Sequence, residues 1–179
     1  MNAVLTRTLA ELIAHGIEGA SVDSIARAAE VNKTSIYRRW PTKEALIAAA
    51  LERVAVDIGA LHEDQGSLRG DLMFLAKQIA TFLESPIGRS LARAALGESA
   101  GPAIAALAAR EIERPRDAVK SLYTRARQRN EWRDGISPES VLGALAGGLM
   151  HRALLEHTKI APAYLAQLID LLVAGVRPA

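Results

Sequence analysis

Cysteine is absent from the 179-residue chain, and aromatic residues make up only 4% of it. Without cysteine the protein can form no disulfide, no CxxC redox site and no thiolate-ligated zinc site. Long apolar runs are lacking as well, because the longest covers residues 141–150 and a membrane-spanning helix needs roughly 20 apolar residues. Residues 1–13 also lack the charged start and apolar block of a secretory signal. We therefore expect a cytoplasmic protein without a membrane partner.

The chain has little excess charge of either sign, since 22 Lys and Arg face 20 Asp and Glu. A nearly neutral chain does not bind polyanions over its whole surface, so any contact with nucleic acid must come from a local basic patch. GxGxxG, P-loop and HExxH sequences are missing, and no nucleophile elbow of the GxSxG type is expected. The four histidines do not have the spacing of metal ligands. We expect no enzyme activity, no catalytic residue, no metal site and no cofactor.

Helical periodicity dominates what the sequence does contain. Apolar residues recur every three to five positions, and no alternating pattern typical of strands persists. The sequence predicts an all-α protein of about nine helices, with a three-helix head at residues 1–46 and a C-terminal helical part at 47–179. Helices are expected over about residues 4–15, 22–29, 33–40, 43–61, 68–84, 86–99, 103–130 (kinked or split at Pro115), 138–157 and 162–176.

Residues 21–43, with the sequence SVDSIARAAEVNKTSIYRRWPTK, contain two short predicted helices joined by the turn 30–32. This order predicts a helix-turn-helix, whose second helix lies in the major groove of DNA. Between residues 27 and 43, five cations face the single acid Glu30, a local charge of +4 that suits phosphate binding. The small core between the two helices is expected to contain Ile25, Ala26, Ala29, Val31 and Ile36.

Several polar side chains in this block suit contact with DNA. Those at the start of the second helix can reach base edges, an arginine can bind guanine, and hydroxyl and ammonium groups can bind phosphate. The alternative for the arginine pair is an ordinary solvated face, and for Trp40 a role in packing. The candidate contacts on this helix and the next are Lys33, Thr34, Ser35, Tyr37, Arg38, Arg39 and Lys43.

Three sequences follow one another at a recognisable spacing. They are GIEGASV at residues 16–22, Ile25-Ala26, and VNKTSIYRRWPTKEAL at residues 31–46. With the helices in the same order over residues 4–55, this part resembles the TetR family of bacterial transcriptional regulators. The resemblance implies three N-terminal helices for DNA and about six C-terminal helices for ligand binding and dimerisation. It also implies a dimeric, often ligand-responsive, repressor.

Carried over by position, the resemblance assigns most of these candidates to the DNA face and Lys43 to the DNA backbone. It adds Ser21 and Val22, which open the supporting helix near the phosphates. Two departures from the family pattern stand out. Glu30 occupies the turn position where the family usually has glycine, which adopts a left-handed backbone without steric cost. Only residues 1–3 precede the first predicted helix, so the basic arm of many members is not expected.

Residues 141–149, VLGALAGGL, are apolar nearly all round. Such a helix must be covered on all sides, and we expect a second copy of the chain to provide one cover in a four-helix bundle. A dimer also reads two DNA half-sites about one helical turn apart. The alternative is a helix central in its own core. The expected interface residues are Leu142, Leu145, Ala146, Leu149, Leu165, Leu168 and Leu172.

A ligand pocket in the C-terminal part is implied by the resemblance alone, and core packing explains its candidate residues equally well. The low aromatic content disfavours a pocket for large flat cations. The basic stretch 110–133 is interpreted as a solvated helix face with pairs such as Asp117 and Lys120. The candidate pocket residues are Leu75, Ile79, Phe82, Tyr123, Met150 and His151.

The function expected from these patterns is a sequence-specific transcriptional regulator. Its partners would be double-stranded DNA with a palindromic operator, a second copy of the chain, and an unknown small-molecule effector that shifts the dimer between two forms. The alternative is an all-α protein-interaction module that does not bind DNA. In that case the basic block would be a solvated surface with no binding role.

Overall fold

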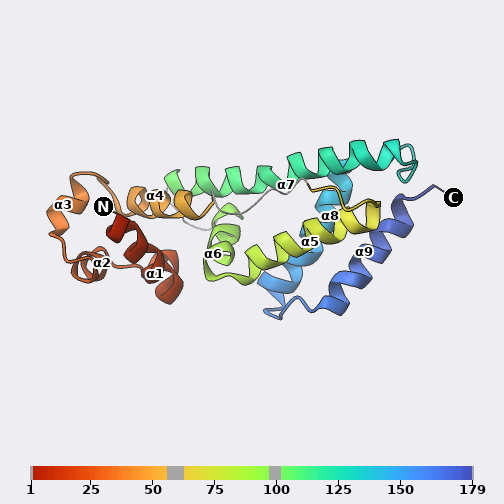
Figure 1. Cartoon of the computed structure of the whole chain (residues 1–179). Helices are drawn as coiled ribbons and strands as arrows, with labels where there is room; N and C mark the ends of the chain where they lie inside the picture. The colour runs from red at the N-terminus through yellow and green to blue at the C-terminus, as the bar shows by residue number, and fades with distance from the viewer. Residues whose placement is uncertain (1, 56–62, 97–101, 179) are drawn as a thin grey trace. The chain divides into compact units, whose positions relative to one another are not determined.

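The computed structural model describes residues 2–55, 63–96 and 102–178. The all-α prediction is confirmed, since these residues form nine α-helices and one π-helical turn and no strand (Figure 1). The elements are α1 (Asn2–Gly19), α2 (Val22–Ala28), α3 (Lys33–Tyr37), α4 (Lys43–Ala55), α5 (Leu68–Glu84), α6 (Pro86–Ala95), α7 (Pro102–Gln128), α8 (Pro138–Met150), the π-helical turn (His151–Leu155) and α9 (Pro162–Val176).

The chain divides into two compact units. The first contains Met1–Gly59 and Pro86–Glu111, and the second contains Ala60–Ser85 and Ile112–Ala179. In the first unit α1 contacts α2, α4 and α6, and α2 contacts α3. In the second unit α5 contacts α8 and α9, which also contact each other (Figure 1). The expected boundary after residue 46 stays a prediction. It divides the chain by function, whereas the two units are defined by their internal contacts.

Side-chain caps set several helix starts where the sequence predicts them. A serine, threonine or asparagine oxygen accepts a bond from a backbone N–H of the first turn, which would otherwise have no partner in the helix. The caps are Ser21 to Ser24 N at 3.3 Å, Asn32 to Thr34 N at 2.8 Å, Thr42 to Ala45 N at 3.1 Å, Ser67 to Gly70 N at 3.1 Å and Ser137 to Ser140 N at 3.1 Å.

Some helix bounds differ from the prediction for physical reasons. α3 ends at Tyr37 rather than Trp40, because a proline disfavours helical backbone in the residue before it. The last turn tightens, so that Arg39 N and Trp40 N both donate to the carbonyl of Ile36. Pro115 lies inside α7 without splitting the helix. α1 contains a break at Gly16, where φ is 70° and ψ is −177°.

A small buried cluster joins the helices of the head. Its members are Val4, Val22, Ile25, Ala26, Ile36 and Leu46, with Trp40 packed against it. Three of the five residues predicted for this core are therefore buried in it, and Ala29 is partly buried beside them. The prediction for Val31 was wrong, because its side chain is 37% exposed. Val31 follows the turn and lines an open hollow with Val4 and Ile36, so it stays in contact with solvent.

A buried carboxylate organises one end of the second unit. Asp71 on α5 is 2% exposed and accepts a hydrogen bond from the backbone N–H of Gln65 at 2.8 Å. Arg125 Nη2 lies 3.3 Å from its Oδ1, and Arg129 Nη2 lies 2.5 Å from its Oδ2. Asp64 and Glu131 complete the network around Arg129, at 2.9 Å each. The network joins the start of α5 to the end of α7.

The interpretation of residues 110–133 as a solvated face was wrong for Arg125 and Arg129, which are largely covered. Burial lowers the pKa of Arg129, but hydrogen bonds to Asp71 and Glu131 outweigh it and the net shift is upward. Asp71 precedes these arginines by more than 50 positions, so helical spacing could not predict the pairing. Lys120 and Asp117 do form an exposed pair at 3.9 Å, three positions apart.

We expect Asp71→Asn to lower the free energy of unfolding by about 3 kcal/mol, because it removes the buried carboxylate that two covered arginines share and leaves only Asp64 and Glu131 to balance them. Urea unfolding followed by circular dichroism measures this change. The matched control is Asp117→Asn, which breaks an exposed pair and should cost at most about 0.5 kcal/mol. Equal, small changes in both variants would contradict a stabilising role for the network.

Candidate nucleic-acid interface

The turn between α2 and α3 has the geometry of a helix C-terminal cap. Glu30 N donates to Arg27 O at 3.2 Å, and Val31 N donates to Ala26 O at 3.0 Å. These two bonds define a Schellman motif, whose residue after the cap has a left-handed backbone. Glu30 occupies that position with a φ of 56°. The turn therefore keeps the left-handed geometry that suits glycine, and Glu30 adopts it with the strain of a residue that has a Cβ.

Hydrogen bonds to α1 fix the start of α2. Glu11 on α1 accepts from Ser21 N at 3.2 Å and from Ser24 Oγ at 2.9 Å. Ser21 is therefore held at the helix start, where backbone N–H groups favour an anion. Val22 is only 6% exposed, which leaves its backbone amide rather than its side chain for DNA.

α3 has one buried apolar residue and a broad polar face. Ile36 is 2% exposed and lies in the head cluster. The six predicted contacts of this segment are all exposed, namely Lys33, Thr34, Ser35, Tyr37, Arg38 and Arg39. Lys43 stands in the first turn of α4, where its Nζ donates to the backbone carbonyl of Glu18 at 2.7 Å. The structure thus gathers the predicted side chains on one helix and the start of the next.

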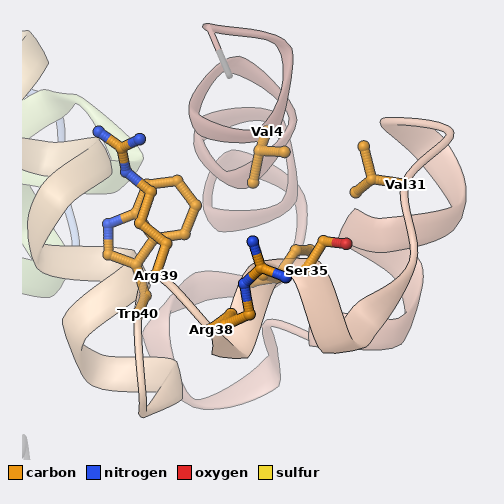
Figure 2. Close-up of a pocket in the computed structure, with 7 residues that line it drawn as sticks. Val4, Val31, Ser35, Arg38, Arg39 and Trp40 are labelled. Atoms are coloured by element: carbon orange, nitrogen blue, oxygen red, sulfur yellow. The ribbon is translucent and has the colours of Figure 1, made fainter.

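An open hollow of about 380 Å³ lies beside α3 (Figure 2). Its lining combines apolar side chains with one hydroxyl and two arginines, from Val4, Val31, Ser35, Ile36, Arg38, Arg39 and Trp40. The Arg39 guanidinium lies 5.4 Å from the centre of the Trp40 ring. Apolar surface next to two cations suits a sugar–phosphate strand, since deoxyribose is apolar and phosphate is anionic. Val4 and Val31 were not among the predicted contacts.

An ion pair links α2 to α3. Lys33 Nζ donates to Asp23 Oδ2 at 2.8 Å, and the two side chains are 44% and 63% exposed. The hydrogen bond to Asp23 outweighs burial and raises the pKa of Lys33. Asp23 was not among the predicted residues, because it precedes the basic block of residues 27–43. The complete motif, residues 21–43, contains Asp23 as a second acid beside Glu30.

The candidate pocket residues all lie in the second unit. Leu75 is buried, His151 is exposed, and Ile79, Phe82 and Met150 are half-buried. Tyr123 packs edge-on against Trp132, with ring centres 5.2 Å apart. His151 Nδ1 lies 3.5 Å from Glu156 Oε1. A ligand-binding role for these residues stays a prediction.

The predicted dimer residues have different positions in a single chain. Leu142, Leu145, Leu149 and Leu165 are buried within it. Leu168, Leu172 and Ala146 are half-buried and retain surface for a partner. Ala144, Gly147 and Leu171 were not among the predicted interface residues and are exposed in the single chain; Leu171 is 72% exposed. Residues 141–149 lack a polar residue that would mark the outer face of the helix, so the direction of each leucine was not readable.

Other kinds of site find little support in the described residues. No group of His, Cys, Asp or Glu in them could hold a metal ion. Among the same residues, no helix is both long and apolar enough to cross a membrane. One GxSxG sequence, typical of serine hydrolases, does occur at residues 97–101, outside the described part. That nucleophile turn follows a β-strand, whereas the described elements on either side are α6 and α7.

A short exposed basic helix held by two supporting helices defines a helix-turn-helix DNA-binding protein. The family model for bacterial regulatory proteins of the tetR family matches residues 4–50, and that for the tetracyclin repressor-like C-terminal domain matches residues 62–172. The transcriptional regulator AqdR of Rhodococcus erythropolis is 30% identical over 176 residues, which cover 96% of this chain and 83% of AqdR. The chain belongs to the TetR family of transcriptional regulators.

Solved structures share the fold. A TetR regulator from Agrobacterium tumefaciens superposes with a TM-score of 0.77 at 20% identity, over 98% of this chain and 92% of that one. The regulator FadR from Bacillus subtilis, solved in complex with stearoyl-CoA, has a TM-score of 0.65 at 14% identity, over 98% of this chain and 99% of that one. At these identities the likeness concerns the fold. Membership of a regulator family favours the DNA-binding interpretation over an interaction module.

We expect Glu30→Gly to raise the free energy of unfolding by about 0.5–1 kcal/mol. A residue with a Cβ pays about 1–2 kcal/mol in the left-handed conformation, and the greater freedom of glycine in the unfolded chain offsets part of this gain. Thermal and urea unfolding measure the change. Glu30→Gln is the control, because it removes the charge and keeps the strain; equal stability of the two variants would exclude strain at this position.

Proposed function

We propose that the protein is a homodimeric, ligand-responsive repressor that binds a palindromic operator in the cytoplasm and has no catalytic role. The observation that carries this proposal is the exposed polar surface of residues 33–39, which are α3 and the two residues that follow it. Hydroxyl, phenol, ammonium and guanidinium groups lie together there around one buried residue, Ile36. Such a face combines groups for base edges with groups for phosphates. A repressor would act by occupying the operator.

In this proposal the two sides of α3 contact the two DNA backbones. Ser21 and Tyr37 bind phosphate on one side, with Lys43 from α4. Ser35 and Arg38, on the wall of the hollow beside α3, bind it on the other, while the start of α3 and Arg39 meet base edges. The support is the placement of these groups around a single short helix, which matches the way a recognition helix enters the major groove.

The dimer is proposed to form through α8 and α9. Leu171 is 72% exposed, and Ala144 and Gly147 on α8 are exposed as well. A Cβ added at Gly147 would meet nothing within 4 Å in the single chain. Small residues on an outward helix face allow a second helix to approach closely, and an exposed leucine beside them gains from burial.

A small-molecule effector is proposed to bind in the second unit. The support is family membership together with the likeness in fold to FadR, which was solved with stearoyl-CoA. An effector can lower DNA affinity only if it binds one form of the dimer more tightly than the other. The candidate pocket residues are the first positions to test with any effector that is found.

We expect Arg39→Ala and Tyr37→Phe each to weaken operator binding. If Arg39 contacts a base, its loss should cost about 1–3 kcal/mol and relax selectivity at that position. Loss of the Tyr37 hydroxyl should weaken binding on all sequences alike, as expected for a phosphate contact. Fluorescence anisotropy with duplexes selected from a random pool, over a range of salt, measures both effects. Arg133→Ala is the control, since it removes one exposed positive charge from the second unit.

Absence of selected duplexes, or equal binding by all of these variants, would contradict the proposed DNA face. Loss of selectivity in Arg39→Ala together with unchanged binding by Arg133→Ala would support it.

We expect Leu171→Glu to convert a dimer into folded monomers, because a carboxylate in an apolar interface loses its hydration. Sedimentation velocity measures the change, and circular dichroism verifies the helix content. Ile13→Glu, at a side chain that is 56% exposed on α1 of the first unit, is the matched control and should remain dimeric. A monomeric wild type, or a dimeric Leu171→Glu, would refute the α8–α9 interface.

A further inference from the structure

The ion pair between α2 and α3 includes a carboxylate, Asp23, that the proposed DNA contacts do not require. Lys33 is the first residue of α3, the end of a recognition helix that reaches base edges. Its Nζ is held at 2.8 Å by Asp23 and lies 5.9 Å from the centre of the Tyr37 ring. Asp23 places a negative charge on the same side of the head as the proposed phosphate contacts, where it opposes DNA binding.

We propose that Asp23 is a selectivity residue, which holds Lys33 in position for base edges and keeps its ammonium from binding phosphates of any sequence. This inference rests on the proposed DNA-binding role of α3. Asp23 acts through Lys33 and is therefore a positioning residue rather than a DNA contact.

The position of Asp23 does not depend on DNA. It lies in the first turn of α2, where a carboxylate is favoured by the helix dipole. The start of that turn is tied to α1, because Glu11 accepts from both Ser21 N and Ser24 Oγ. Lys33 has a flexible four-carbon stem, so its ammonium would otherwise sample many directions. The rigid partner thus restricts the flexible one before DNA arrives.

The pair is suited to discriminate between sequences because it is weak. Both side chains are about half exposed, and exposed pairs hold together only marginally. Binding to unselected DNA consists almost entirely of phosphate neutralisation, with a salt slope that steepens by about 0.9 for each added contact. A cation held by a carboxylate contributes less to that binding. On the selected sequence, Lys33 contacts a base edge from the position in which Asp23 holds it, and this contact stabilises the complex.

The test compares two duplexes with the full-length protein. One is a mixed-sequence duplex long enough for two half-sites, and the other is the duplex that the wild type selects from a random pool. We expect Asp23→Asn to raise affinity for the mixed duplex about fivefold at low salt and to steepen its salt slope by about 0.9. Affinity for the selected duplex should change by less than about twofold, so that selectivity falls.

Two further variants isolate the mechanism. The control Asp117→Asn makes the same change in charge in the second unit and should leave both affinities unchanged. Asp117 pairs with Lys120 at 3.9 Å, and their side chains are 75% and 64% exposed. In the background of Lys33→Gln, Asp23→Asn should have no more effect than Asp117→Asn, because the effect depends on Lys33. Circular dichroism verifies that each variant is folded.

The outcomes separate this inference from the proposed function. If the wild-type protein selects no duplex from the random pool, the proposed function itself is contradicted. A selective wild type with unchanged mixed-duplex binding in Asp23→Asn overturns the inference alone. An equal effect of Asp23→Asn with and without Lys33 overturns it too, because Asp23 would then act by its own charge or as a base contact. The inference is established if Asp23→Asn raises affinity for the mixed duplex and this increase disappears in the Lys33→Gln background.

Discussion

The DNA-reading head depends on the burial of one side chain. α3 has five residues, and an isolated helix of that length is not stable in water, so tertiary packing must hold it. Ile36 supplies that packing, because it is 2% exposed and lies among Val22, Ile25 and Leu46. Every other residue of α3 is thereby free to be polar. The orientation of the proposed DNA face follows from the position of this isoleucine in the cluster.

The two units use positive charge differently. In the second unit Arg69, Arg125 and Arg129 are paired with carboxylates, and Asp71 brings two of them together in a covered site. On α3 and the two residues after it, Lys33, Arg38 and Arg39 are exposed, and Asp23 is a weak local partner of Lys33. A chain with a formal net charge of only +2 can therefore present a basic surface to DNA, because much of its remaining charge is balanced within the second unit.

Local patterns predicted the fold well, and the site in part. Helix α5 begins and ends where the sequence predicts, since Ser67 caps it and apolar residues mark its buried face. Long-range relations were not predictable. The ion pair of Asp23 and the network of Asp71 join different helices, and no spacing within one helix encodes them. Residues 141–149 showed that burial was needed, but an all-apolar pattern does not tell which side faces a partner.

The hydrogen bond from Lys43 to the carbonyl of Glu18 has a mechanical consequence. An ammonium has three N–H donors, so a phosphate can bind the same nitrogen while the bond to α1 remains. The DNA backbone would then be tethered, through one atom, to the final turn of α1. That turn follows the break at Gly16, where the backbone leaves helical geometry. The proposed phosphate contact would therefore be anchored two residues beyond that break, at the carbonyl of Glu18.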